Sequence, residues 1–177
     1  MIGANSRHSD SNAGHPVHVE REGKMVDSIV FAGRFFFNVT AAVGTGQPNR
    51  LDDVELVRFG YKMQRKDPRL VSRPGTAARQ QLADKMNGTG PFAPDLQAVI
   101  TAHEIERGGA QDGRVTPAQH YANIDGTYDH QHIWIIMALN NAMRFVAKDI
   151  YPRIDLHIES GSEVSRVVRG FFLVKGT

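Results

Sequence analysis

Residues 87–96 read NGTGPFAPDL, residues 108–117 read GGAQDGRVTP, and a short apolar-faced segment lies between them. Asn-Gly and Asp-Gly pairs are favoured where the backbone takes a positive φ, so each stretch indicates a turn. Pro94 and Pro117 suit the first turn of a helix, and Gly108 suits the end of one. The pattern therefore predicts turn, helix, turn, helix. One face of the first helix carries Leu96, Val99, Ile100 and His103.

Upstream of these turns, residues 49–66 predict a longer helix that begins near Asp53. Asp52-x-x-Glu55 has the form of a capping box. Asp67-Pro68 is expected to end the helix, because the residue before a proline avoids the α region. On a helical wheel, two apolar arcs flank a basic stripe, so we expect a helix that packs on two sides and leaves its basic residues in water.

This layout resembles the peptidoglycan-binding domain family over roughly residues 44–120. That family opens with a Val-x-Leu-Val-Gln helix and continues through Asp-Gly, an aromatic-Gly-Pro turn, a helix ending in Phe-Gln and a second Asp-Gly. The chain departs from the pattern in three places. Asn87 replaces the first Asp, Ala93 replaces a glycine, and His103-Glu104 replaces the Phe-Gln pair.

The resemblance implies a bacterial, non-enzymatic module with no cofactor and with a shallow groove between helices. In that family, polar and aromatic side chains at the groove accept a glycan or a stem peptide. Carried onto this sequence, the implied ligand-binding residues are Tyr61, Asn87, Phe92, Gln97 and Arg107.

The flanking segments extend this core on both sides. Residues 1–16 are rich in Ser, Asn, Gly and His and are expected to be disordered. Residues 17–43 contain β-branched and aromatic runs bounded by glycine, which predict a β-hairpin or ribbon. Residues 124–177 predict two more helices. The first is largely apolar, ends at Pro152 and is expected to be the central helix; the second follows a capping box, Ser160-x-x-Glu163.

The predicted fold class is thus mainly α (α+β), with a peptidoglycan-binding-like helical core, an N-terminal β-hairpin and added C-terminal helices. We expect one domain over residues 17–177, divided into a β element (17–43), the core (44–123) and a C-terminal helical layer (124–177). A chain of 177 residues is long enough to fold without disulfides, and it has no cysteine. The missing cysteines exclude thiol nucleophiles and Cys-ligated zinc.

The sequence shows no secretory signal in its first residues and no apolar run long enough to span a membrane. The expected localisation is therefore cytoplasmic, or the cell envelope by a non-classical export route. The net charge is only +2, which does not favour nucleic acid as a partner.

Basic residues concentrate between Arg58 and Arg79, where Asp67 is the one acid. The plain interpretation is a solvated helix face. The alternative is a surface for peptidoglycan or another anionic cell-envelope polymer, formed by Arg58, Lys62, Lys66 and Arg69.

His130-x-His132, with Asp129, is the best candidate for a metal site. Positions i and i+2 of a helix point to different sides, so the pair can ligate one ion only in an extended segment. Helix-start and surface histidines are the competing interpretation, and we expect no bound zinc.

Three functional hypotheses follow. The first is a non-catalytic module that binds the peptidoglycan cell wall. The second is a protein-interaction or structural component of a phage-like or secretion assembly, favoured by the absent signal and the altered Phe-Gln pair. The third and weakest is a zinc-dependent cell-wall hydrolase.

Overall fold

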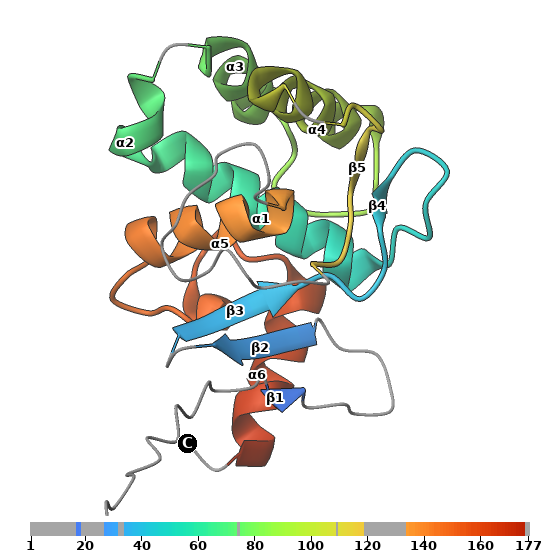
Figure 1. Cartoon of the computed structure of the whole chain (residues 1–177). Helices are drawn as coiled ribbons and strands as arrows, with labels where there is room; N and C mark the ends of the chain where they lie inside the picture. Colours follow the sequence, from blue (N-terminus) through green and yellow to red (C-terminus); the bar gives the residue numbers. More distant parts are fainter. Residues whose placement is uncertain are drawn as a thin grey trace, which may run out of the picture.

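The computed structural model describes residues 17–18, 27–31, 34–73, 75–108, 110–118 and 134–175 (Figure 1). The predicted disordered segment, residues 1–16, lies outside them. The strands are β1 (Val17–His18), β2 (Asp27–Phe31), β3 (Arg34–Asn38), β4 (Val43–Gly44) and β5 (Arg114–Val115). The helices are α1 (Leu51–Lys66), α2 (Pro68–Val71), α3 (Ala77–Lys85), α4 (Pro94–Arg107), α5 (Ile135–Val146), the short 3-10 helix η1 (Ile154–Leu156) and α6 (Ser162–Lys175). The predicted mainly α class is confirmed for this part of the chain.

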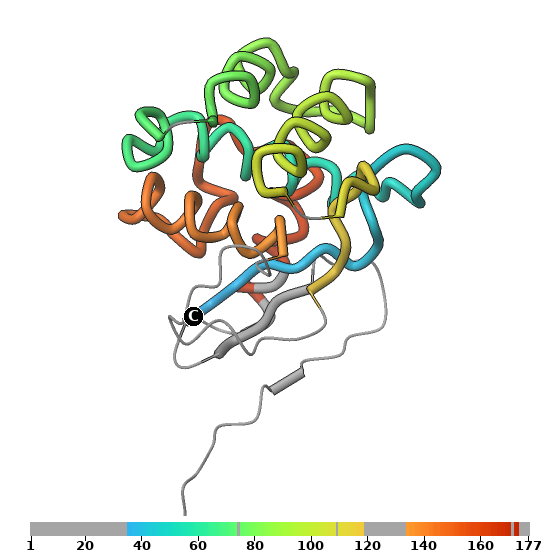
Figure 2. The backbone as a smooth tube through the Cα atoms, turned by 45° about the horizontal axis from the view of Figure 1, so that its top comes forward, coloured from blue at the N-terminus to red at the C-terminus, as the bar shows by residue number. Residues whose placement is uncertain are grey.

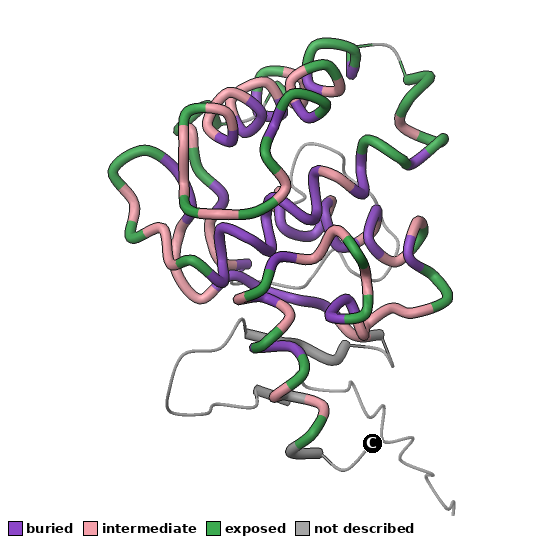
Figure 3. The backbone as a smooth tube through the Cα atoms, turned by 180° about the vertical axis from the view of Figure 1, so that it is seen from behind, coloured by how far each residue is buried: buried purple, intermediate pink, exposed green. Residues whose placement is uncertain are grey.

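The central helix is α1, which contacts α3, α5 and α6. Figure 1 shows α3 and α4 on one side of it and α5 with the three-stranded sheet on the other. Twelve of its 16 residues are buried, and Figure 3 shows the buried residues gathered in the middle of the molecule. The largely apolar helix that was expected to end at Pro152 is not the central one, and as α5 it ends at Val146. α1 is buried on nearly every side because its polar residues as well as its apolar ones find partners.

The crossing of α1 and α5 depends on Gly60. A Cβ atom at this position would lie 2.7 Å from the Cβ of Leu139, which is fully buried. Glycine therefore lets the two helices approach closely enough to pack Leu139 against the α1 backbone. Any larger residue forces the helices apart or displaces Leu139.

The predicted β-hairpin is confirmed. β2 and β3 pair antiparallel from Asp27 opposite Asn38 to Phe31 opposite Arg34, and β1 pairs with β2. Among the described residues, side chains rather than a strand pair with the other edge of β3. Asn140 accepts a hydrogen bond from the Phe37 amide (2.8 Å) and donates one to the Phe37 carbonyl (2.7 Å). Tyr151 donates to the Phe35 carbonyl (2.8 Å). The mainly apolar α5 helix thus carries the polar group that joins it to the sheet.

Both predicted capping boxes are wrong. α1 begins at Leu51, two residues before the predicted start, and Arg50 makes no side-chain cap. Glu55 instead caps a distant helix, because its carboxylate accepts from the α6 amides of Glu163 (2.8 Å) and Val164 (2.9 Å). The Ser160 hydroxyl, expected to cap α6, accepts from Ser165. The carboxylate that resembled a local cap of α1 therefore joins α1 to the N-terminal end of α6.

One apolar core joins all of these elements. It contains Phe36 and Phe37 from the hairpin, α1 and α4 side chains, and Val164 and Val168 from α6. Figure 2 shows the same arrangement from a second direction, with the hairpin strand β3 running beside the helices. The β element and the C-terminal helices are therefore packed into the same core as residues 44–118.

Candidate functional site

The Gly113 turn and the segment around Gly44 meet at a small sheet that the sequence did not predict. β4 and β5 pair at Val43 with Val115 and at Gly44 with Arg114. Gln97 of α4 accepts from the Thr45 amide (2.8 Å) and donates to the Gly113 carbonyl (3.0 Å), so one side chain spans both strand ends. Glycine is required at Gly44, because a Cβ there would lie 2.9 Å from the Cβ of Arg114 and closer still to the Gly113 carbonyl.

Glu104 completes this junction from two turns further along α4. Its carboxylate accepts from the amides of Gly113 (2.9 Å) and Arg114 (3.2 Å). Burial raises the pKa of Glu104, while these two amide hydrogen bonds oppose that rise. Gln97 and Glu104 thus both form hydrogen bonds with the Gly113 turn. These bonds explain why α4 carries polar residues on an inward face.

The first glycine turn is held by a buried ion pair. Arg58 of α1, only 1% exposed, makes two hydrogen bonds of 3.0 Å with the Asp95 carboxylate. The same guanidinium donates to the carbonyls of Asn87 (2.8 Å) and Pro91 (2.9 Å), which bracket the turn. The hydrogen bonds from Arg58 hold the pKa of Asp95 below its usual value. A planar guanidinium suits this role, because it donates to several acceptors at once.

Behind the turn, Tyr61 and His103 form a buried pair. The Tyr61 hydroxyl lies 3.1 Å from Nδ1 of His103, and the two side chains come from α1 and α4. Burial raises the pKa of Tyr61. Burial also lowers the pKa of His103 well below 6.5, and the charges of Arg79 and Arg107 lower it further. The histidine is therefore neutral, and it lies in the core on the α4 face that also carries Leu96, Val99 and Ile100.

Arg79 of α3 extends this polar group to a third helix. Its Nε donates to Glu106 of α4 (2.7 Å), and its Nη1 donates to Gln64 of α1. Arg107 lies half-buried at the end of α4, and burial lowers its pKa. The network joins α1, α3 and α4 through paired groups, which is the arrangement that buried charges need.

The structure does not bring the five implied ligand-binding residues into one exposed groove. Tyr61 is fully buried against His103, and Gln97 bridges β4 and β5. Arg107 is half-buried beside the Arg79 network. Only Asn87, which is exposed, and Phe92, which is half-buried, flank the same turn.

The predicted basic stripe is also changed by its surroundings. Arg58 is not on the surface, because Asp95 and the turn carbonyls enclose it. Lys66 pairs with Glu159, and Arg69 pairs with the buried carboxylate of Asp67. Lys62 lies against Gly88, where a Cβ atom would overlap its amine. The long-range acids were invisible in the local sequence, so the stripe carries a weaker field than its composition indicates.

The metal candidates Asp129, His130 and His132 lie outside the described residues, so the expectation of no bound zinc stays a prediction. Among the residues with described structure, no group of three or more His, Asp or Glu side chains is arranged to hold a metal ion. Within those same residues, each helix is too short or too polar to cross a membrane.

Comparison with family models, with curated proteins and with solved structures gave no match. The resemblance to peptidoglycan-binding domains therefore rests on the residues of this chain.

Proposed function

We propose that this chain is a non-catalytic interaction module that docks on a protein partner, as a component of a phage-like or secretion-type assembly. In this proposal the chain keeps a peptidoglycan-binding-like arrangement of turns and helices as a scaffold and does not use it to hold a glycan. The observation that carries the proposal is the position of Tyr61 and Gln97. Both side chains are engaged inside the fold, with His103 and with the β4–β5 junction respectively.

The charge arrangement supports the same proposal. Lys66 and Arg69, expected to meet an anionic polymer, are paired with Glu159 and Asp67. Cations that are already paired add little affinity for a polyanion, and salt screens what remains of their charge. The titratable side chains with shifted pKa values, such as His103 and Glu104, hold helices and turns together, which favours a structural rather than a catalytic role.

Binding to the peptidoglycan cell wall is the second candidate. It is favoured by the first glycine turn, which Arg58 holds in a fixed shape with Asn87 exposed and Phe92 half-buried beside it. In this alternative the ligand contacts the turn itself rather than a groove between helices.

Co-sedimentation of the purified chain with isolated cell-wall sacculi tests the two candidates. We expect no pelleting above background at low or moderate salt. Saturable pelleting that is lost in an Asn87→Ala, Phe92→Ala double variant would instead establish the second candidate. Lys66→Glu, Arg73→Glu is the matched control for nonspecific charge, because these residues lie at the end of α1 and after α2, outside the turn.

A further inference from the structure

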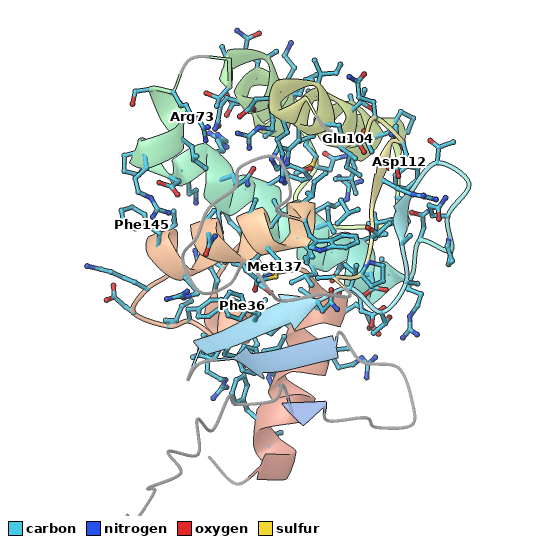
Figure 4. All side chains as sticks on the ribbon, viewed as in Figure 1. Phe36, Arg73, Glu104, Asp112, Met137 and Phe145 are labelled. Carbon is cyan, nitrogen blue, oxygen red and sulfur yellow. The ribbon has the colours of Figure 1, made fainter. Side chains whose placement is uncertain are left out.

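Exposed apolar side chains gather at the C-terminal end of α1. Seven large apolar residues are exposed among the residues whose side chains are described, and four of them lie on segments that contact this end. Val71 is 57% exposed, Phe145 43%, Leu156 60% and Ile158 96%. Together with Lys66 and Arg69 they form what we call the α1-end face. Figure 4 places the labelled Phe145 on the side of the molecule opposite Asp112.

The loop that presents Leu156 and Ile158 is anchored on both sides of each residue. The carboxylate of Asp155 accepts two hydrogen bonds of 2.9 Å from Arg153. His157 packs edge-on against Phe59 of α1, with ring centroids 5.2 Å apart, and Glu159 binds Lys66. The two apolar side chains are therefore held outward by a loop with fixed neighbours, so little conformational entropy is lost when a partner covers them.

The other half of the face is equally fixed. The guanidinium of Arg69 lies 3.7 Å from the centroid of the Phe145 ring, and the same group contacts the Asn141 carbonyl of α5. Asp67, whose side chain is 0% exposed, holds Arg69 from behind. Val71 follows at the end of α2. Aromatic and arginine side chains of this kind dominate the binding energy of protein interfaces.

The charge around this face is positive. Residues 62–73 contain five cations, Lys62, Arg65, Lys66, Arg69 and Arg73, and their acidic neighbours are Asp67, Asp84 and Glu159. Two like-charged copies of the face repel each other, which disfavours a symmetric dimer. Three of the cations are paired with acids, which leaves too small an excess of positive charge to hold an anionic lipid surface. The complement is a protein surface with an apolar centre and an acidic rim.

We infer that the α1-end face is the docking surface for a protein partner whose contact region is apolar at its centre and rich in Asp and Glu at its rim. This inference rests on the proposed function. Ile158 and Phe145 fill the apolar centre, and the exposed Arg73, two positions after Val71, meets the acidic rim.

Photo-crosslinking of the full chain in its cells of origin tests the inference. Ile158 and Phe145 are each replaced by p-benzoylphenylalanine, and Ile105, 59% exposed on α4, is the matched control. We expect one identified protein to be crosslinked from positions 158 and 145 and not from 105. The purified partner is then titrated with the chain. Ile158→Asp and Arg73→Glu should each weaken binding at least tenfold, Ile105→Asp should leave it unchanged, and added salt should weaken it.

Four results would overturn the inference. They are crosslinking from position 105 alone, no crosslinking from 158 or 145, flotation with phosphatidylglycerol vesicles that Ile158→Asp abolishes, and a concentration-dependent dimer that Ile158→Asp abolishes. Crosslinking from 105 alone leaves the protein-interaction function standing and removes only this surface. Saturable sacculus binding through Asn87 and Phe92, with no crosslinking anywhere, removes both.

Discussion

The β4–β5 end of the molecule and the α1-end face differ in how their side chains are used. At the β4–β5 end, Gln97 and Glu104 give their polar atoms to the turns that they support. At the α1-end face, Ile158 is 96% exposed and yet lies in an anchored loop. The difference shows that the residues that belong to recognisable sequence motifs stabilise the fold. Residues that are free to bind lie on segments where the sequence has no motif.

The largest expected effect comes from breaking the first glycine turn. Arg58→Met removes a buried guanidinium, which leaves the Asn87 and Pro91 carbonyls without their donor and Asp95 without its ion-pair partner. We expect the free energy of unfolding to fall by roughly 3 kcal/mol, measured by urea denaturation. Arg114→Met, which removes an exposed pair with Asp112, is the control and should cost roughly 0–1 kcal/mol. Equal losses in the two variants would contradict the structural role of Arg58.

A smaller effect is expected at the junction of β4 and β5. Gly44→Ala places a Cβ against Gly113 and Arg114, and we expect a loss of roughly 2 kcal/mol. Gly46→Ala is the matched control, since its φ is +71 and nothing lies within 4 Å of the added atom. It should cost roughly 1 kcal/mol from backbone conformation alone. If thermal denaturation ranks Gly46→Ala as the more damaging change, the close approach of the strands is not what fixes the glycine.

The Tyr61–His103 pair gives a pH-dependent prediction. Because the folded-state pKa of His103 is well below 6.5, the unfolded chain binds a proton first as the pH falls. The stabilising contribution of the neutral His103 is complete above pH 6.5. Below pH 6.5 the free energy of unfolding falls by at most about 1.4 kcal/mol per pH unit. His103→Phe should remove this part of the slope between about pH 6.5 and 5. An unchanged slope in chemical denaturation would contradict a neutral, buried histidine.

A double-mutant cycle separates the hydrogen bond from the packing at the same pair. Tyr61→Phe and His103→Phe each leave one buried polar atom without its partner, at a cost of roughly 1 kcal/mol. The double variant has neither polar atom. Its loss in the free energy of unfolding should therefore be smaller than the sum of the losses in the two single variants. A coupling energy near zero would show that the 3.1 Å contact contributes nothing.

The smallest effect is expected at the α1-end face. Ile158→Asp should change the free energy of unfolding by less than about 0.5 kcal/mol, because the side chain is almost fully exposed. Leu96→Asp, at a fully buried position of α4, is the contrasting variant and should prevent folding. If Ile158→Asp is also strongly destabilising, the residue belongs to the core and the face is not available for docking.

Local signals predicted much of the fold. Pro94 marks the observed start of α4, Gly108 adopts a left-handed conformation at its end, and the β-branched and aromatic runs of residues 27–38 form the predicted hairpin. Long-range partners could not be predicted in the same way. Glu55 resembles a local cap but binds α6, and Arg58 resembles a surface cation but meets Asp95, 37 positions away. A helical wheel can place a charged residue between two apolar arcs. That residue is exposed only if no further segment of the chain packs over it.

The candidate sites were less predictable than the fold. The basic stripe was predicted from the local density of Lys and Arg. The acids that pair with these cations lie as far along the chain as Glu159. Tyr61 was assigned to a groove from the family pattern, although an aromatic residue on an apolar arc of a central helix is expected to be buried. The α1-end face had no sequence signal, since Val71, Phe145, Leu156 and Ile158 belong to three separate segments.

The most direct test of the central claim is an NMR titration of the labelled full chain with soluble peptidoglycan fragments, followed at the amides of residues 87–90 and of Phe92. The account predicts no saturable shifts in this turn, because its side of the molecule serves as scaffold and docking occurs at the α1-end face. Saturable shifts of Asn87 and Phe92, absent when Asn87 is changed to Ala, would contradict it and return the glycan-binding function to first place.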